Sequence, residues 1–200
     1  MPEKKGIVRT TLVVLPAQIV FRGIEAVLPL LLAYWFGRSA ATDVYNFVFM
    51  VFALAGSLVF TAYQDSALVP ILAEERLARR AEMPRLLGSL LAHTWLIGGV
   101  IATAVGGLAI AAFAIRWSGP ELRLSALMVV PFSFFLVAVS TRTFFATLLA
   151  SEHRYLVQPV ASCLGMIANL GTLALLHART GIALVPVAAL AGELVATAVL

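Results

Sequence analysis

The feature that most constrains this chain is a succession of apolar stretches, each long enough to cross a lipid bilayer as an α-helix. Charged residues make up 12% of the 200 residues and hydrophobic residues 62%, with a mean hydropathy of +1.00. A soluble domain usually carries about twice that share of charge. The composition therefore excludes a water-soluble globular domain, and it also excludes an intrinsically disordered chain.

Six apolar stretches follow one another, separated by short polar segments. One crossing of the hydrocarbon core needs about 20 helical residues, whereas membrane strands are about 10 residues long and alternate in polarity. We therefore predict an all-α fold, a polytopic membrane helix bundle in one domain (residues 1–200). Its six transmembrane helices are expected over residues 7–36, 44–73, 86–115, 124–150, 156–176 and 182–200.

Basic residues divide unevenly between the two sets of polar segments. Eight Lys and Arg lie in the N-terminus and in residues 74–85 and 151–154, and four lie in residues 37–43, 116–123 and 177–181. Cytoplasmic loops are enriched in Lys and Arg, so we predict a multi-pass inner-membrane protein with a cytoplasmic N-terminus. The net charge of +4 is then explained by basic loops that face anionic lipids. We therefore expect membrane lipids, and not nucleic acid, as partners.

Two opposite charges, Arg22 and Glu25, share one face of the first predicted helix. Gln18, one turn before Arg22, extends this polar stripe. The two charges either neutralise each other inside the bundle or line a hydrated cavity in which Arg22 binds phosphate. Arginine suits the second role because its planar guanidinium binds phosphate through two hydrogen bonds and stays charged. Gln18, Arg22 and Glu25 are therefore candidate substrate-binding residues.

Further ionisable residues fall inside the predicted spans, where a charge costs about 2.5–3.5 kcal/mol at the bilayer centre. Arg142 either extends its long side chain to the interface or adds a second positive group to the cavity, and it is the fourth candidate substrate-binding residue. Asp65 and Glu193 are candidate sites for an ion or proton. Two embedded amides, Asn46 and Asn169, are expected to hydrogen-bond to neighbouring helices.

The sequence contains no recognisable catalytic motif. The histidines, His93, His153 and His177, lie on different segments without the spacing of metal ligands, and Cys163 is the single cysteine. Neither a Gly-x-Ser-x-Gly turn nor a phosphate-binding loop is present. We therefore predict that the protein is not an enzyme and has no catalytic residue, metal or cofactor.

Two blocks of the sequence form a recognisable pattern. The first combines Phe36-Gly37, Ala-Thr-Asp-Val-Tyr (41–45) and Val-Pro-Ile-Leu-Ala-Glu (69–74), and the second is Leu-Leu-Ala-Ser-Glu-His-Arg-Tyr (148–155). They resemble the MurJ/MviN family of lipid II flippases, within the multidrug/oligosaccharidyl-lipid/polysaccharide exporter superfamily. The arginine pair usual in that family's second helix is absent from Leu-Ala-Gly-Ser-Leu (54–58), so the resemblance to the superfamily is the stronger one.

The resemblance implies two six-helix lobes around a central cavity, and this chain would be the N-terminal lobe. The last stretch is still apolar at Leu200, so we expect a fragment of a longer protein, in which a second lobe or a second copy completes the cavity. The implied function is alternating-access transport of an undecaprenyl-pyrophosphate-linked saccharide such as lipid II, in peptidoglycan or polysaccharide biosynthesis. Two alternatives are a cation-coupled small-molecule or drug antiporter of the same superfamily and a non-transporting membrane scaffold.

Overall fold

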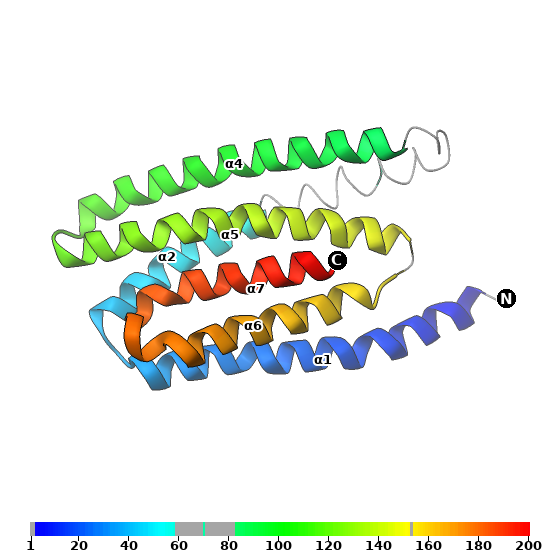
Figure 1. Ribbon diagram of the computed structural model, residues 1–200, viewed down its shortest axis with the longest axis horizontal. Coiled ribbons are helices and arrows are strands. Elements are labelled where there is room, and N and C mark those ends of the chain that lie inside the picture. Colours follow the sequence, from blue (N-terminus) through cyan, green and yellow to red (C-terminus); the bar gives the residue numbers. More distant parts are fainter. Residues whose placement is uncertain (1–2, 59–69, 71–82, 153) are drawn as a thin grey trace.

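The computed structural model describes residues 3–58, 70, 83–152 and 154–200. Side chains are described for residues 14–58, 70, 85–152 and 154–200. This part of the chain is helical and contains no strand, which confirms the all-α class for it (Figure 1). The elements are α1 (Glu3–Phe36), α2 (Ala40–Gly56), α4 (Met83–Arg116), α5 (Pro120–Ser151), α6 (Val157–Thr180), the 3₁₀-helix η3 (Gly181–Leu184) and α7 (Val185–Val199).

Four helical stretches within the described ranges are long and apolar enough to cross a membrane, so the protein is a multi-pass membrane protein. They are Val14–Phe36, Arg85–Arg116, Pro120–Ser151 and Val157–Val199. α2 is a fifth, shorter apolar helix of 17 residues. By this criterion of length and composition the described residues hold five apolar stretches and not the six predicted, because α6 and the 15-residue α7 are counted as one stretch. The predicted second span, residues 44–73, continues beyond Leu58 into residues outside those described.

Glycines reverse the chain between helices at one end of the bundle. Gly37, Gly119 and Gly181 have φ angles of 56°, 62° and 65°, in the left-handed region that other residues avoid. They follow α1, precede α5 and follow α6, respectively. Because the chain turns at these glycines, the connections between helices are shorter than the predicted polar segments 37–43 and 116–123. The helices joined by each turn run antiparallel.

A local cap starts α2 directly after the first of these turns. Ser39 has an extended backbone, and its hydroxyl oxygen accepts a hydrogen bond from the backbone N–H of Thr42 at 3.2 Å. Asp43 adds a negative charge in the first helical turn, where the helix dipole favours it. Part of the Ala-Thr-Asp-Val-Tyr pattern at residues 41–45 thus has a structural role in beginning a helix.

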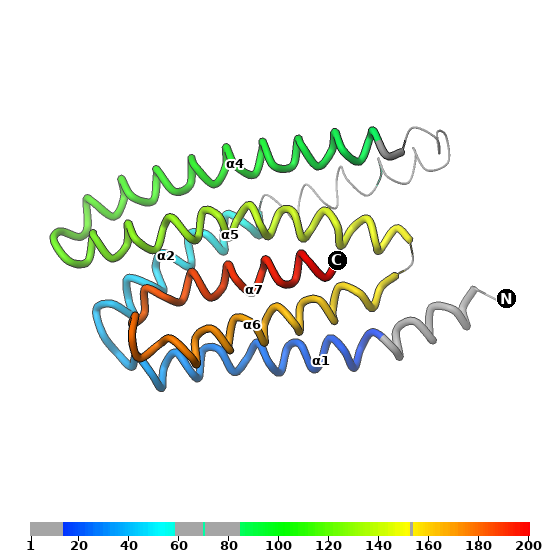
Figure 2. Tube along the Cα trace, viewed as in Figure 1, coloured from blue at the N-terminus to red at the C-terminus, as the bar shows by residue number. Residues whose placement is uncertain are grey.

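The helices α4, α5, α7, α6 and α1 lie side by side in that order, and α2 packs against α5 (Figures 1 and 2). The connections at residues 37–39 and 117–119 and the helix η3 lie at one end of this array. The connection between α5 and α6 lies at the other end, near the N-terminus. This order places α7 between α5 and α6, so that side chains of α7 meet residues of both.

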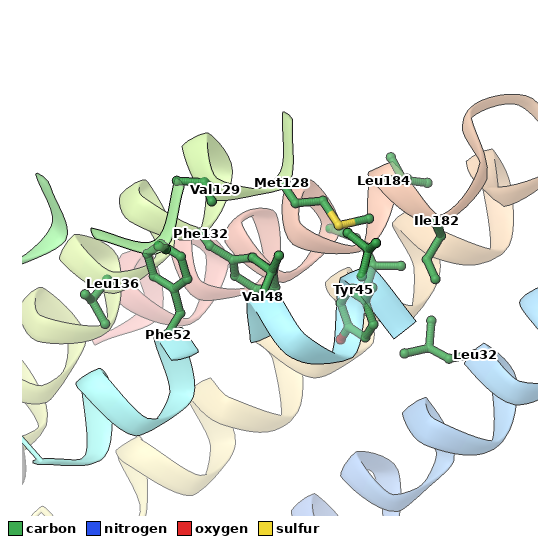
Figure 3. Packing of buried hydrophobic residues seen from close by; sticks show 14 of the residues in the cluster. Leu32, Tyr45, Val48, Phe52, Met128, Val129, Phe132, Leu136, Ile182 and Leu184 are labelled. Carbon is green, nitrogen blue, oxygen red and sulfur yellow. The ribbon is translucent and has the colours of Figure 1, made fainter. Parts of the chain in front are cut away.

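The main core lies between α2 and α5 near the glycine turns (Figure 3). Val48, Met128 and Phe132 are fully buried, and the rings of Phe52 and Phe132 stack with centroids 5.6 Å apart. The core extends to Leu32 on α1 and Val185 on α7. Because these two side chains also line a neighbouring cavity, the core forms one wall of that cavity.

α6 and α7 approach each other backbone to backbone at Gly165 and Gly192. A Cβ atom added to either glycine would lie 2.6 Å from the carbonyl oxygen of the other, closer than real side chains come. Small residues permit such close helix contacts in membrane proteins. This contact fixes the position of the next residue, Glu193, relative to α6.

Candidate binding cavity

A cavity of about 670 Å³ lies among α1, α2, α5, α6 and α7. Its lining is mainly apolar, yet each of these helices contributes a polar side chain: Glu25, Asn46, Arg142, Asn169 and Glu193, in that order. The volume is within the range of about 300–1,000 Å³ that is usual for small-ligand sites. The combination of apolar walls and a few polar groups suits an amphipathic ligand.

Arg142 and Glu193 form an ion pair across the cavity wall. The Nε atom of Arg142 donates to Oε2 of Glu193 at 2.6 Å, and the two side chains are only 22% and 15% exposed. The partners come from α5 and α7 and are 51 residues apart in sequence. Arg142 thus turns toward α7 and contributes a positive group to the cavity lining.

The pair leaves hydrogen-bonding capacity on the guanidinium. Glu193 accepts the hydrogen bond from Nε, and the two Nη groups of Arg142 have no hydrogen-bond partner among the described residues. The end of the guanidinium carries four N–H donors, which match the oxygens of a phosphate or carboxylate. The cavity can therefore bind an anion at Arg142 without first breaking the bond to Glu193.

Arg22 and Glu25 also form an ion pair, but at the edge of the cavity. Nη1 of Arg22 lies 2.6 Å from Oε2 of Glu25, and the side chains are 74% and 42% exposed. Glu25 lines the cavity, whereas Arg22 does not. Three residues of helix correspond to a rotation of about 300°, so Arg22 points about 60° away from the direction of Glu25.

The four predicted substrate-binding residues are thus divided by the fold. Glu25 and Arg142 line the cavity, while Arg22 and Gln18 are exposed on α1 and lie outside the lining. Gln18 shares the face of Glu25 but lies about 10 Å along the helix axis, at a rise of about 1.5 Å per residue. Of the two predicted ion or proton sites, Glu193 lines the cavity and Asp65 lies outside the described residues.

Asn169 is a polar cavity residue whose role the sequence interpretation missed. It is 6% exposed, and its Oδ1 atom has no hydrogen-bond partner within the described part of the chain. Its Nδ2 atom contacts only the weak acceptor Sδ of Met166, at 3.9 Å on the same helix. The expected bond from Asn169 to a neighbouring helix is therefore wrong for these residues. The sequence did show a single amide within an apolar stretch. Whether that amide finds a partner depends on how the helices pack, which the sequence does not show.

No family model, curated protein or solved structure matches this chain. Among the residues with described positions, no group of three or more His, Cys, Asp or Glu side chains could hold a metal ion. The polar groups that line the cavity are one guanidinium, two carboxylates, the amides of Asn46 and Asn169, and the hydroxyls of Thr42, Tyr45 and Ser162.

Proposed function

We propose that this protein is the N-terminal lobe of a flippase that moves an undecaprenyl-pyrophosphate-linked saccharide, such as lipid II, across the bacterial inner membrane by alternating access. The observation that carries the proposal is the guanidinium of Arg142, mostly buried in a mainly apolar cavity of a multi-pass membrane protein. A charge at membrane depth is costly and commonly marks a substrate pathway. A second lobe or a second copy would complete the cavity.

The chemistry of the ligand matches the two kinds of surface in the cavity. The pyrophosphate would bind the free Nη groups of Arg142, and the apolar wall would contact the lipid part. The resemblance of residues 36–45, 69–74 and 148–155 to the flippase family supports the same ligand class. The eight basic residues in one set of loops and terminus, against four in the other, support a cytoplasmic N-terminus.

The decisive experiment compares two variants that differ only at Arg142. Arg142→Gln/Glu193→Gln removes both charges, so neither is left buried without a partner, whereas Glu193→Gln alone keeps the guanidinium. Binding of undecaprenyl-pyrophosphate-linked N-acetylglucosamine to protein in nanodiscs is the measurement. The double variant should bind about tenfold to a hundredfold more weakly than wild type, because charge-assisted hydrogen bonds are lost.

The single variant Glu193→Gln leaves the guanidinium without its acidic partner, so its folding is checked first. The folded variant should bind at least as tightly as wild type, since it lacks the competing carboxylate. Equal binding by wild type and the double variant would contradict the proposal. In proteoliposomes, the double variant should also fail to expose a fluorescent form of this lipid to a membrane-impermeant quencher on the opposite side.

A cation-coupled antiporter is the second candidate function, and the two carboxylates of the cavity favour it. Glu25 and Glu193 both line the space, and carboxylates at membrane depth often bind protons or cations. This function predicts efflux of a lipophilic cationic dye from proteoliposomes driven by a pH gradient, and its loss in Glu193→Gln. Dye efflux without movement of the lipid-linked saccharide would favour the antiporter over the flippase.

The scaffold alternative rests on the fact that both embedded arginines already have acidic partners. It predicts a dry cavity, which thiol labelling can test. In a Cys163→Ala background, Glu25→Cys and Arg142→Cys should react with a water-soluble maleimide if the cavity is hydrated. A control variant, Val48→Cys, lies in the fully buried core and should remain unlabelled. Protection of all three positions would favour the scaffold.

A further inference from the structure

The amide of Asn169 is an unused polar group inside the cavity. A buried side-chain amide ordinarily finds partners for its oxygen and nitrogen, because burial without them costs free energy. Among the described residues the Oδ1 atom of Asn169 has no partner and its Nδ2 atom donates only to the weak acceptor Sδ of Met166, although the residue is almost wholly buried. The fold thus maintains an unfavourable group at a position where leucine has nearly the same shape.

The position of this amide links it to the charged pair. Asn169 lies in the wall of the same cavity as Arg142 and Glu193. Its Cβ atom lies 3.0 Å from the place where a Cβ on Gly192 would be, so the amide begins beside the residue that precedes Glu193. A ligand held at Arg142 on α5 therefore has a second polar side chain in the lining of the same cavity, on α6.

A second buried polar atom serves as an internal comparison. The hydroxyl of Thr197 on α7 also has no partner within the described ranges, but Thr197 does not line the cavity. An unpartnered group away from the cavity can have only a structural effect. The same kind of group at the cavity wall can additionally meet a ligand, which makes the two residues a matched pair for experiment.

We propose that Asn169 is a recognition site for the saccharide of the transported lipid, pairing its amide with a sugar hydroxyl or acetamido group. This inference rests on the proposed function and assigns the sugar to Asn169 and the pyrophosphate to Arg142. The Oδ1 atom is occluded in this structure, so pairing requires the amide to turn about χ2, a soft torsion. Sugars suit the site because their hydroxyl and acetamido groups both donate and accept hydrogen bonds, as the amide does.

Two lipid probes separate the contributions of sugar and phosphate. Undecaprenyl pyrophosphate and undecaprenyl pyrophosphate carrying one N-acetylglucosamine are each titrated against protein in nanodiscs. Wild type should prefer the sugar-bearing lipid by about twofold to tenfold, the range expected for one net hydrogen bond. Asn169→Leu should abolish this preference while binding the bare pyrophosphate lipid as wild type does.

Two further variants complete the design. Asn169→Asp retains an acceptor oxygen and should retain part of the preference, and Thr197→Val should retain all of it. The unfolding temperature of Asn169→Leu should not fall, since the substitution removes an unsatisfied polar group. If the leucine variant does not fold, Asn169→Ala removes the amide without adding bulk, and the same comparison applies.

The outcomes distinguish this inference from the function on which it rests. If wild type binds neither lipid, the proposed function and the inference are both overturned. If wild type binds both lipids, and Asn169→Leu keeps the preference or loses both lipids equally, the assignment of the sugar to Asn169 is wrong. The flippase proposal then stands on Arg142 alone.

Discussion

The two ion pairs have the same N–O distance of 2.6 Å but very different surroundings. Arg22 and Glu25 are neighbours on one turn of α1 and are largely exposed on the surface of the described residues, so no second helix takes part in their contact. Arg142 and Glu193 join α5 to α7 and are largely buried. The two pairs therefore differ in stabilising free energy despite their equal N–O distance, because that free energy depends on what replaces the contact when it is broken.

Breaking the buried pair should have the largest effect on stability. Arg142→Ala or Glu193→Ala leaves one buried charge uncompensated and should lower the free energy of unfolding by about 3–5 kcal/mol. The double variant Arg142→Met/Glu193→Leu should recover most of this loss, because no charge remains buried. Thermal unfolding in detergent, followed by tryptophan fluorescence, measures both. A single variant as stable as wild type would show that the pair is not buried in solution.

Displacing α7 should break the same pair indirectly. Gly192→Ala places a methyl group 2.6 Å from the carbonyl oxygen of Gly165 and should destabilise the protein by about 1–3 kcal/mol as the helices separate. Gly171→Ala, on α6, meets nothing within 4 Å and is the matched control. Unfolding in detergent should distinguish the two variants. Equal stabilities would contradict the close backbone contact between α6 and α7.

Breaking the exposed pair should have the smallest effect. Arg22→Ala should change the free energy of unfolding by less than about 1 kcal/mol, and salt should reduce even this difference, as for other exposed pairs on one helix. Unfolding in low and high salt tests the expectation. A loss as large as that in Arg142→Ala would mean that the membrane, or a further part of the protein, covers Arg22 and makes the two pairs alike.

The same contrast explains how much the sequence could predict. Arg22 and Glu25 are three residues apart, so helical periodicity alone brings them together. Arg142 and Glu193 are 51 residues apart, and their contact depends on α7 lying beside α5, which no local pattern specifies. The lack of a partner for Oδ1 of Asn169 among the described residues was equally inaccessible, since it depends on what the neighbouring helices place beside the amide.

Helical content was predictable because long apolar stretches in a membrane have few ways to satisfy their backbone. The span over residues 124–150 thus agrees closely with α5 (Pro120–Ser151). The boundary between the last two predicted spans was less accurate, because α6 continues through polar residues to Thr180. The reversal there occurs at Gly181 and not over the whole polar segment.

The contact between Gly165 and Gly192 has a mechanical consequence for the cavity. With no side chain between the two backbones, this point is the natural fulcrum for any rocking of α7 against α6. Glu193 lies one residue, about 1.5 Å, from the fulcrum, whereas Val185 at the beginning of α7 lies about 10 Å away. A small tilt would therefore move Val185 about seven times as far as the backbone of Glu193. The cavity wall at Val185 would thus shift while the carboxylate of Glu193 stays bonded to Arg142.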